Sequence, residues 1–530
     1  MFFKNLFIRN KEPIQKSSNF WADDNQVNKL PLVSAIKRVA KRNKGDLIFD
    51  PVGYDEWLYI ASSDLGKLKK LLYEKYSSKS QTLLSMPKEN YTFRPISYLL
   101  PSDSIIYQAI VDKLIMYKKD KFSNQVYSNI INDIENSEVF KIPVKYWLKM
   151  RDNIRRQYKK GNEFYFFSDI SGYFENIKIE KLLSIIPFHI GRNEKEYETL
   201  LKKLLTKWQF ANSQGLIQPH DASSILAKIY LMPIDAALAD LKEKYSRYVD
   251  EFYIITNTEK ELKLKICYLC EKLRELGLNL NSSKSRYLLG KDILDEINEE
   301  QDYFNLVNYI EFHLLDLELA QSVVDSKFDE FTLKFENCEN VNMKIFRSCI
   351  RRYVKNQNPR AINFCLKILG KNYSQTVDIV KYFSGFLKYE SYSEKIMGKV
   401  TEYLNNREMN LYQWVQCWLL NLYIETDYSS HVDTELLKNI FSNKNQNYLS
   451  RATALLAYAK HSSDFDLIDL PEIYRETNDI LLKRAILAAS SKMPRTYTEE
   501  MYKIESSDEL DIIILKEYLQ KNNYKIEMRI

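Results

Sequence analysis

Two acidic positions, each beside a run of strand-forming residues, are the part of this sequence best suited to chemistry. Residues 245–255 read YSRYVDEFYII, so aromatic and β-branched residues flank the acidic pair Asp250 and Glu251. These residue types favour strands, and we expect a hairpin with the acidic pair at its turn. A second run, residues 164–169, reads FYFFSD and ends on Asp169. If the two strands are neighbours in one sheet, the carboxylates lie close together.

Carboxylates grouped in this way suit a divalent cation. Burying adjacent carboxylates without a counter-charge is costly, whereas Mg²⁺ binds carboxylate oxygens and leaves its other positions to water and substrate phosphates. Two-metal phosphoryl transfer needs carboxylates from two separate elements. We therefore expect Asp169, Asp250 and Glu251 to bind Mg²⁺ or Mn²⁺ and to be catalytic. The alternative is that the acidic pair is only an exposed hairpin tip.

The composition is that of a protein with well-formed cores. The chain has 530 residues, of which 45% are hydrophobic and 28% charged, and it carries a net charge of +6 and six cysteines. This length allows two or three domains, and so few cysteines do not form a disulfide scaffold. The mild positive charge permits a nucleic-acid partner without requiring one. No apolar run approaches the roughly 18 residues that span a membrane, so we expect a cytoplasmic protein without a membrane partner.

Glycine and proline divide the chain near Gly290. They are frequent before this position and rare after it, which indicates many turns in the first part and few in the second. We therefore expect an α+β fold up to Gly290 and an all-α part over residues 291–530. A helical-repeat array is the expected form of that second part, although no fixed-period signature is present.

The order of these pieces resembles the palm of reverse transcriptases. Residues 169–174, DISGYF, are similar to the first catalytic motif of that family, and residues 248–251, YVDE, are similar to the second, usually written Tyr-x-Asp-Asp. The resemblance covers roughly residues 90–290 and is to the bacterial abortive-infection and other phage-defence reverse transcriptases. It implies an N-terminal extension and fingers over residues 1–160, a palm of the ferredoxin-like split β-α-β type over residues 161–290, and the helical domain after them.

The resemblance also implies four nucleotide-binding residues. Arg94, on the Arg-Pro strand of the fingers, is expected to hold the triphosphate, because its planar fork suits phosphate. Phe174 is expected to exclude a ribose 2′-hydroxyl, which implies deoxyribonucleoside triphosphates as substrates, although it could equally be a core residue. Gln218 is expected beside the nascent base pair. Lys284 is expected to contact the triphosphate and to protonate the leaving pyrophosphate.

The third motif departs from the family pattern. Residues 215–219, GLIQP, are similar to Gly-x-Pro-Gln-Gly, but Pro219 stands at the second glycine. Proline fixes φ and lacks an N–H group, so this loop does not imply conventional template handling. His220 follows it, and a lone histidine at a loop–helix junction is more often a cap or a surface residue than a catalytic one.

A basic stripe is predicted in the second part of the chain. Arg347, Arg351 and Lys355 are spaced by four residues and should share one helix face. The stripe is either a nucleic-acid-binding surface or a plain solvated face. Scaffolding, homo-oligomerisation and product binding are the expected roles of the helical domain.

Two functions remain open at this point. The first is a Mg²⁺-dependent, reverse-transcriptase-like DNA polymerase in anti-phage defence. It would either copy a non-coding RNA or add nucleotides without a template, and it could start on one of its own tyrosines, which would leave the DNA product covalently attached. The second is a catalytically inert palm that acts as a sensor of nucleic acid or phage and as a scaffold.

Overall fold

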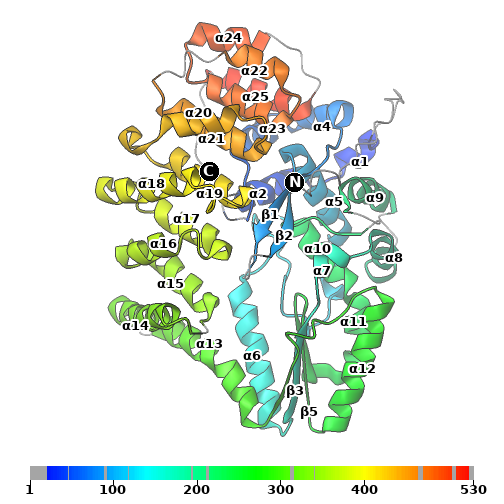
Figure 1. The fold of residues 1–530 in the computed structure, drawn as a ribbon. Helices are drawn as coiled ribbons and strands as arrows, with labels where there is room; N and C mark the ends of the chain where they lie inside the picture. Colours follow the sequence, from blue (N-terminus) through cyan, green and yellow to red (C-terminus); the bar gives the residue numbers. More distant parts are fainter. Residues whose placement is uncertain are drawn as a thin grey trace.

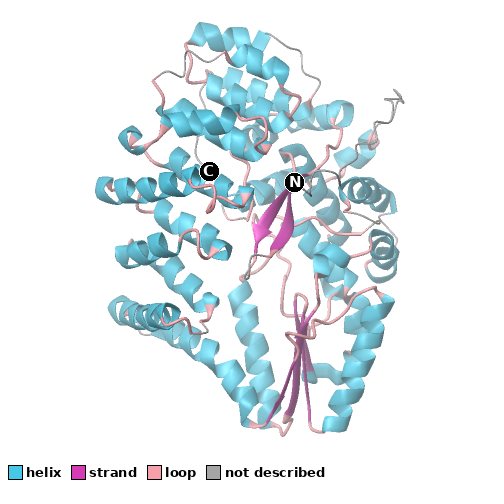
Figure 2. Ribbon diagram, in the orientation of Figure 1, coloured by secondary structure: helices cyan, strands magenta, loops and turns pink. Residues whose placement is uncertain are grey.

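The structure is a computed structural model of the chain. It describes residues 21–43, 45, 47–88, 92–116, 118–191, 195–210, 214–310, 316–339, 341–463, 469–503 and 509–523. Helices dominate, and the strands form two small sheets (Figure 2). Within these residues, every helix is too short or too polar to cross a bilayer.

The N-terminal part combines helices with one hairpin. Its elements are α1 (Asp24–Asn28), α2 (Leu32–Asn43), α3 (Asp55–Ser63), α4 (Leu65–Lys75), β1 (Thr82–Pro87), β2 (Phe93–Tyr98), α5 (Pro101–Ile115) and α6 (Pro143–Lys159). α5 is buried along nearly its whole length and packs against α2. Its buried residues lie on every face and include polar ones such as Asp103 and Asp112, so α5 forms the centre of this part.

A four-stranded antiparallel sheet contains the acidic residues. It consists of β3 (Phe164–Asp169), β4 (Tyr245–Tyr248), β5 (Glu251–Thr256) and β6 (Arg286–Leu289), in the spatial order β4-β5-β3-β6. When the four strands are numbered 1 to 4 along the chain and the sheet is read from the β6 edge, the order is 4-1-3-2. Helices join β3 to β4 and β5 to β6, which gives the ferredoxin-like β-α-β-β-α-β arrangement expected for the palm.

Strand alternation gives this sheet two buried faces. One face, with Phe166, Phe252 and Ile254, packs on the core that contains α10 (Asp221–Tyr230) and α12 (Glu259–Glu275). The other face, with Tyr165, Tyr253 and Ile255, packs on α6 and on α13 (Lys291–Tyr309). The remaining helices between β3 and β4 are α7 (Tyr173–Asn176), α8 (Ile179–His189), α9 (Lys195–Trp208) and α11 (Met232–Ala237). α6, predicted within the fingers range, therefore lies against the palm sheet.

From Lys291 onward the described residues contain helices and no strand. The helices are α13 (Lys291–Tyr309), α14 (Leu317–Glu336), α15 (Met343–Lys355), α16 (Ile362–Ile368), α17 (Thr376–Ser384), α18 (Glu390–Asn405), α19 (Gln413–Glu425), α20 (Thr434–Ser442), α21 (Tyr448–His461), α22 (Leu470–Glu476), α23 (Ile480–Ser490), α24 (Arg495–Lys503) and α25 (Leu510–Lys521). They start beside the palm and run along one side of the molecule to the N-terminal helices (Figure 1).

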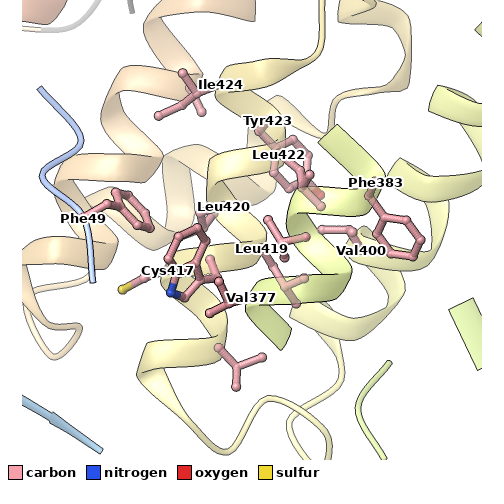
Figure 3. Close-up of a cluster of buried hydrophobic side chains, with 14 of the residues drawn as sticks. Phe49, Val377, Phe383, Val400, Cys417, Leu419, Leu420, Leu422, Tyr423 and Ile424 are labelled. Atoms are coloured by element: carbon pink, nitrogen blue, oxygen red, sulfur yellow. The ribbon is translucent and has the colours of Figure 1, made fainter. Parts of the chain in front are cut away.

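One hydrophobic core joins the two ends of the chain. Phe49 belongs to the same buried cluster as the α19 side chains from Cys417 to Ile424. Val377 and Phe383 of α17 are part of this cluster too (Figure 3). The same core includes Leu84 and Ile96 of the β1–β2 hairpin. The hairpin that carries Arg94 is therefore packed against the C-terminal helices.

A buried ionic cluster forms a second connection between the two ends. Arg484 on α23 has no exposed side-chain surface; its Nη1 lies 2.5 Å from Asp50 Oδ2, and its Nη2 lies 2.7 Å from Glu56 Oε1. The Tyr98 hydroxyl of β2 donates to the same Asp50 oxygen at 2.6 Å. On α25, Asp511 accepts from the Ser102 amide at 3.0 Å. The pairing satisfies most of the buried polar atoms, while Arg484 Nε and Glu56 Oε2 are buried without a hydrogen-bond partner among the described residues.

Candidate active site

The two predicted acidic elements meet in the sheet. Asp169, the last residue of β3, is directly opposite Glu251, the first residue of β5. Asp250 lies in the turn just before Glu251, and its carbonyl accepts from the Ile170 amide at 3.2 Å. The structure therefore brings Asp169, Asp250 and Glu251 together at one edge of the palm, as the spacing of the two motifs predicts.

Asp250 is strongly influenced by its neighbours. The pKa of its carboxyl group is raised to about 6, mainly by burial and then by the charges of Glu251 and Asp169, while Arg94 acts in the opposite direction. Like charges held close together disfavour ionisation. The charges of Glu251, Asp169 and Arg94 therefore all act on the carboxyl group of Asp250.

Lys284 also reaches this site. Its Nζ donates to Asp169 Oδ2 at 2.8 Å, and this hydrogen bond raises the pKa of the lysine. Lys284 lies in the turn before β6, where the Lys284 amide bonds the Asn281 carbonyl at 3.1 Å and the Asn281 amide bonds the Asp169 carbonyl at 2.8 Å. The turn therefore positions the ammonium group beside the acid at the end of β3.

Glu251 has a partner of its own. The Tyr253 hydroxyl, two residues further along β5, donates to Glu251 Oε2 at 2.5 Å. The glutamate side chain is one methylene longer than the usual aspartate and lies on the same face of the strand as Tyr253. The bond occupies one lone pair of Oε2 and draws on its negative charge, so it weakens that oxygen as a ligand for a cation.

The carboxylates fit a divalent cation in their chemistry. Asp169 Oδ1 is buried and has no hydrogen-bond partner among the described residues, and hard cations such as Mg²⁺ prefer carboxylate oxygens. Over the same residues, no three carboxylate, imidazole or thiol groups are arranged closely enough to hold a metal ion as they stand. Asp169 and Asp250 are therefore the first candidates for ligands, and Glu251 is a weaker candidate because its Oε2 accepts from Tyr253.

Arg94 lies on β2, opposite Met86 in the hairpin, and is half-buried. Its effect on the pKa of Asp250 shows that the guanidinium is within electrostatic range of the acidic residues. The fingers strand therefore brings a positive charge toward the carboxylates, where a triphosphate would need one.

Phe174 contacts the loop of the third motif, and Gln218 is part of that loop. Phe174 is partly buried against the palm core, and its carbonyl accepts from the Leu216 amide at 2.8 Å. Gln218 is almost fully buried, and its carbonyl accepts from the Ser97 amide of β2 at 2.5 Å. These contacts join the loop of residues 214–220 to both the first catalytic motif and the fingers strand.

His220 occupies the N-cap position of α10, where its place at the loop–helix junction puts it, but its side chain bonds another strand instead of capping the helix. Its Nε2 lies 3.1 Å from the Ser97 carbonyl, and the N-cap position that it occupies before α10 makes no side-chain capping bond. The pKa of His220 is lowered to about 3, mainly by burial and then by the charge of nearby Arg42. The imidazole is therefore neutral and can donate to the carbonyl, which connects the third motif to β2.

Sequence reasoning missed the residues that support the acidic turn. Arg247 is 1% exposed in β4 and forms an ion pair with Asp235 at 2.5 Å, and the Ser128 hydroxyl accepts from the Val249 amide at 2.6 Å. An arginine within a strand of otherwise apolar and aromatic residues was a usable signal, because charged residues are almost never fully buried unless they are paired. Ser128 gave no signal of this kind.

The predicted basic stripe lies apart from the acidic site. Arg347, Arg351 and Lys355 are all on α15, which packs against α14 and α17. Arg351 is largely exposed and its Nη2 lies 3.2 Å from Asp378 Oδ1. These residues share a helix as expected, and nucleic-acid binding by them remains a prediction.

Residues 86–335 match the family described as reverse transcriptase (RNA-dependent DNA polymerase). The matched segment runs from the β1–β2 hairpin through the whole palm sheet and into α14. The chain thus contains a reverse-transcriptase-like domain, and this domain includes all the residues grouped around Asp169. No curated protein matches the chain.

Solved structures of telomerases have partial similarity to the chain. Telomerase from Candida albicans, in complex with a fragment of telomeric RNA, is 12% identical, with 68% of this chain and 70% of that chain covered and a TM-score of 0.31. The corresponding complex from Candida tropicalis is 14% identical, with 70% and 68% covered and a TM-score of 0.30. Apo telomerase from Candida tropicalis is 11% identical, with 85% and 74% covered and a TM-score of 0.33.

Proposed function

We propose that the protein is a Mg²⁺-dependent DNA polymerase of the reverse-transcriptase type. The observation that carries the proposal is the grouping of Asp169, Asp250, Lys284 and Arg94, which come from four separate segments of a reverse-transcriptase-like domain. Acidic and basic groups that converge in this way, with a perturbed pKa among them, are typical of a site for phosphoryl transfer.

Each residue has a defined role in this proposal. A bound divalent cation would supply the charge that activates the attacking hydroxyl and neutralises the leaving group. Asp169 and Asp250 hold that cation, and Glu251 assists. Arg94 orients the triphosphate of the incoming deoxyribonucleotide, and Lys284 donates a proton from Nζ to the leaving pyrophosphate. Phe174 excludes a ribose 2′-hydroxyl, and Gln218 lies beside the nascent pair.

The template and the primer are further parts of the proposal. The buried Gln218 and the ring of Pro219 restrict the loop at which a template base would approach, and this favours synthesis without a conventional template. A non-coding RNA template is the alternative. The sequence resemblance supports a role in anti-phage defence, in the cytoplasm and as a homo-oligomer, and it also supports a start on a tyrosine hydroxyl.

The test is incorporation of labelled deoxyribonucleotides. Purified protein is incubated with each nucleotide and Mg²⁺, with and without cellular RNA, and the products are separated on a denaturing gel before and after protease treatment. Wild-type protein should incorporate label, and Asp169→Asn and Asp250→Asn should abolish it. Asp329→Asn changes an exposed acid that is paired with Arg360 on the helical side and should retain full activity. An Asp250→Asn variant with normal incorporation would exclude the assignment.

The Tyr253–Glu251 hydrogen bond favours a second candidate function. Because this bond occupies the residue that replaces the second catalytic aspartate, the palm could instead be an inert sensor of nucleic acid or phage and a scaffold. An Asp169→Asn, Asp250→Asn double variant separates the two functions in a phage-infection assay. A sensor retains protection in this variant, and a polymerase loses it.

A further inference from the structure

The turn that presents Asp250 contains an unfavourable backbone conformation. Val249, the residue before Asp250, has a φ of 56°. This is the left-handed region, which glycine adopts readily and β-branched residues strongly disfavour. Such a conformation persists only where surrounding contacts fix it. The neighbours of Val249 should therefore include groups that hold its backbone.

Both polar backbone groups of Val249 are bound by side chains. Its N–H donates to Ser128 Oγ at 2.6 Å, and its carbonyl accepts from Arg247 Nη1 at 2.6 Å. Ser128 is 3% exposed. Both contacts come from residues that precede Val249, one from a segment about 120 residues upstream and one from the strand that enters the turn.

Arg247 is itself fixed in place. Its Nε and Nη2 donate to the two carboxylate oxygens of Asp235 at 2.7 and 2.5 Å, and Asp235 also accepts from the Tyr245 hydroxyl at 2.7 Å. A bidentate arginine–carboxylate pair fixes the orientation of the guanidinium group as well as stabilising the contact. The remaining guanidinium nitrogen, Nη1, is therefore aimed at the Val249 carbonyl.

The segment that carries Ser128 is fixed by a buried lysine. Lys228 on α10 is 5% exposed, and its Nζ donates to the Ser128 and Asn129 carbonyls at 3.0 Å each. The ammonium group also lies 4.8 Å from the centre of the Phe122 ring. Further along the segment, the Arg247 amide bonds the Gln125 carbonyl at 2.9 Å, and the Tyr127 amide bonds the Arg247 carbonyl at 2.9 Å.

We propose that Ser128, the Arg247–Asp235 pair and Lys228 form a brace that positions the catalytic turn. The brace holds Val249 in its left-handed conformation and so directs the Asp250 carboxylate toward Asp169. These are positioning residues, because none of them touches the reacting groups. The catalytic consequence rests on the proposed polymerase function, whereas the mechanical part concerns the turn alone.

The first test measures the turn without any reference to activity. Hydrogen exchange of the Val249 amide is followed by mass spectrometry with electron-transfer fragmentation in wild-type protein, Ser128→Ala and Ser128→Thr. Ser128→Ala should lower protection by about tenfold, the factor that corresponds to one hydrogen bond, and Ser128→Thr, which keeps the hydroxyl, should restore it. Ser123→Ala is the matched control, because Ser123 Oγ accepts from Gln125 in the same segment at 3.2 Å without touching the turn.

The second test is a double-mutant cycle in the nucleotide-incorporation assay. Ser128→Ala should lower kcat by roughly tenfold to a hundredfold, the effect of a small misplacement of a catalytic group, and should leave the nucleotide KM unchanged. Val249→Gly removes the strain, so the turn depends less on its brace. Ser128→Ala should therefore have a smaller effect on kcat in the Val249→Gly background than in wild type.

The outcomes separate the brace from the polymerase assignment. Unchanged Val249 protection in Ser128→Ala overturns the brace, whatever the activity. Lost protection with unchanged kcat overturns its role in positioning, as do independent effects of the two substitutions in the cycle. If wild-type protein incorporates no nucleotide under any condition, the polymerase assignment fails, and the exchange experiment alone decides whether the brace exists.

Discussion

Asp169 and Glu251 are paired residue to residue across β3 and β5, yet their carboxylates have different partners. Asp169 accepts from the Lys284 ammonium on one side of the pair, while Glu251 accepts from the Tyr253 hydroxyl on its own strand. The two acids therefore differ in how readily they can bind a cation, although they occupy directly opposite positions in the pairing of β3 with β5.

The partner of Glu251 should weaken cation binding. Because the hydrogen bond from Tyr253 weakens Oε2 as a ligand, removing the hydroxyl should lower the Mg²⁺ concentration needed for half-maximal incorporation by about twofold to tenfold, the range that one hydrogen bond represents. Titration of Mg²⁺ with the Tyr253→Phe variant measures this. Tyr287→Phe, which removes another tyrosine–glutamate hydrogen bond, to Glu259, should leave the titration unchanged. A higher Mg²⁺ requirement in Tyr253→Phe would contradict the prediction.

Arg94 should act on the nucleotide through its shape as well as its charge. Arg94→Lys keeps a positive charge near Asp250 but loses the planar fork, so we expect the KM for deoxyribonucleotides to rise by about tenfold, and Arg94→Ala to raise it further. Steady-state incorporation at varied nucleotide concentration gives both values. Arg286→Lys, at an exposed arginine that bonds Glu296, is the control. An unchanged KM in both Arg94 variants would remove Arg94 from the site.

The acidic motifs could be predicted from sequence because their signals are local. Aromatic strands that end at an acid specify both the elements and their pairing, and Asp169 and Glu251 lie opposite each other as that pattern implies. The brace could not be predicted, because Ser128 and Lys228 act through contacts about 100 residues away along the chain. The contact of His220 could not be predicted either, since its partner Ser97 belongs to a distant strand.

The helical part was predictable in type and not in its connections. Scarce glycine and proline after Gly290 indicate helices, and the described residues there form helices. The ion pairs of Arg484 with Asp50 and Glu56 join positions more than 400 residues apart, and no periodic pattern contains such information. The domain limits at residues 160 and 290 remain predictions.

The neutral state of His220 should make the protein sensitive to acid. Its pKa is lowered to about 3 in the folded chain from an ordinary value near 6.5. Between these values the unfolded chain binds more protons, so the free energy of unfolding should fall as the pH falls below about 6.5. Urea unfolding at about pH 7 and about pH 5 should show a smaller loss for His220→Gln than for wild type. Equal losses would contradict the expected contribution of His220.

Arg484 should contribute more to stability than any exposed arginine. Arg484→Met leaves Asp50 and Glu56 buried without their counter-charge, which typically costs about 3–5 kcal/mol. Arg360→Met removes an exposed pair with Asp329 and should cost no more than about 1 kcal/mol. Chemical denaturation of both variants, monitored by tryptophan fluorescence, gives the comparison. A loss of stability in Arg484→Met no larger than that in Arg360→Met would show that the buried cluster does not stabilise the junction.

The buried junction of Arg484 and Asp511 with the N-terminal part also constrains how the protein is made. Asp50, Glu56 and Ser102 leave the ribosome long before the residues that cover them, and the hairpin with Arg94 packs on α19, which is also synthesised after it. Domains usually fold as units during synthesis, the N-terminal one first. In this chain the strand with Arg94 lacks its buried partners until α23 and α25 have left the ribosome, so a nascent chain that stops before α23 should be unable to add nucleotides.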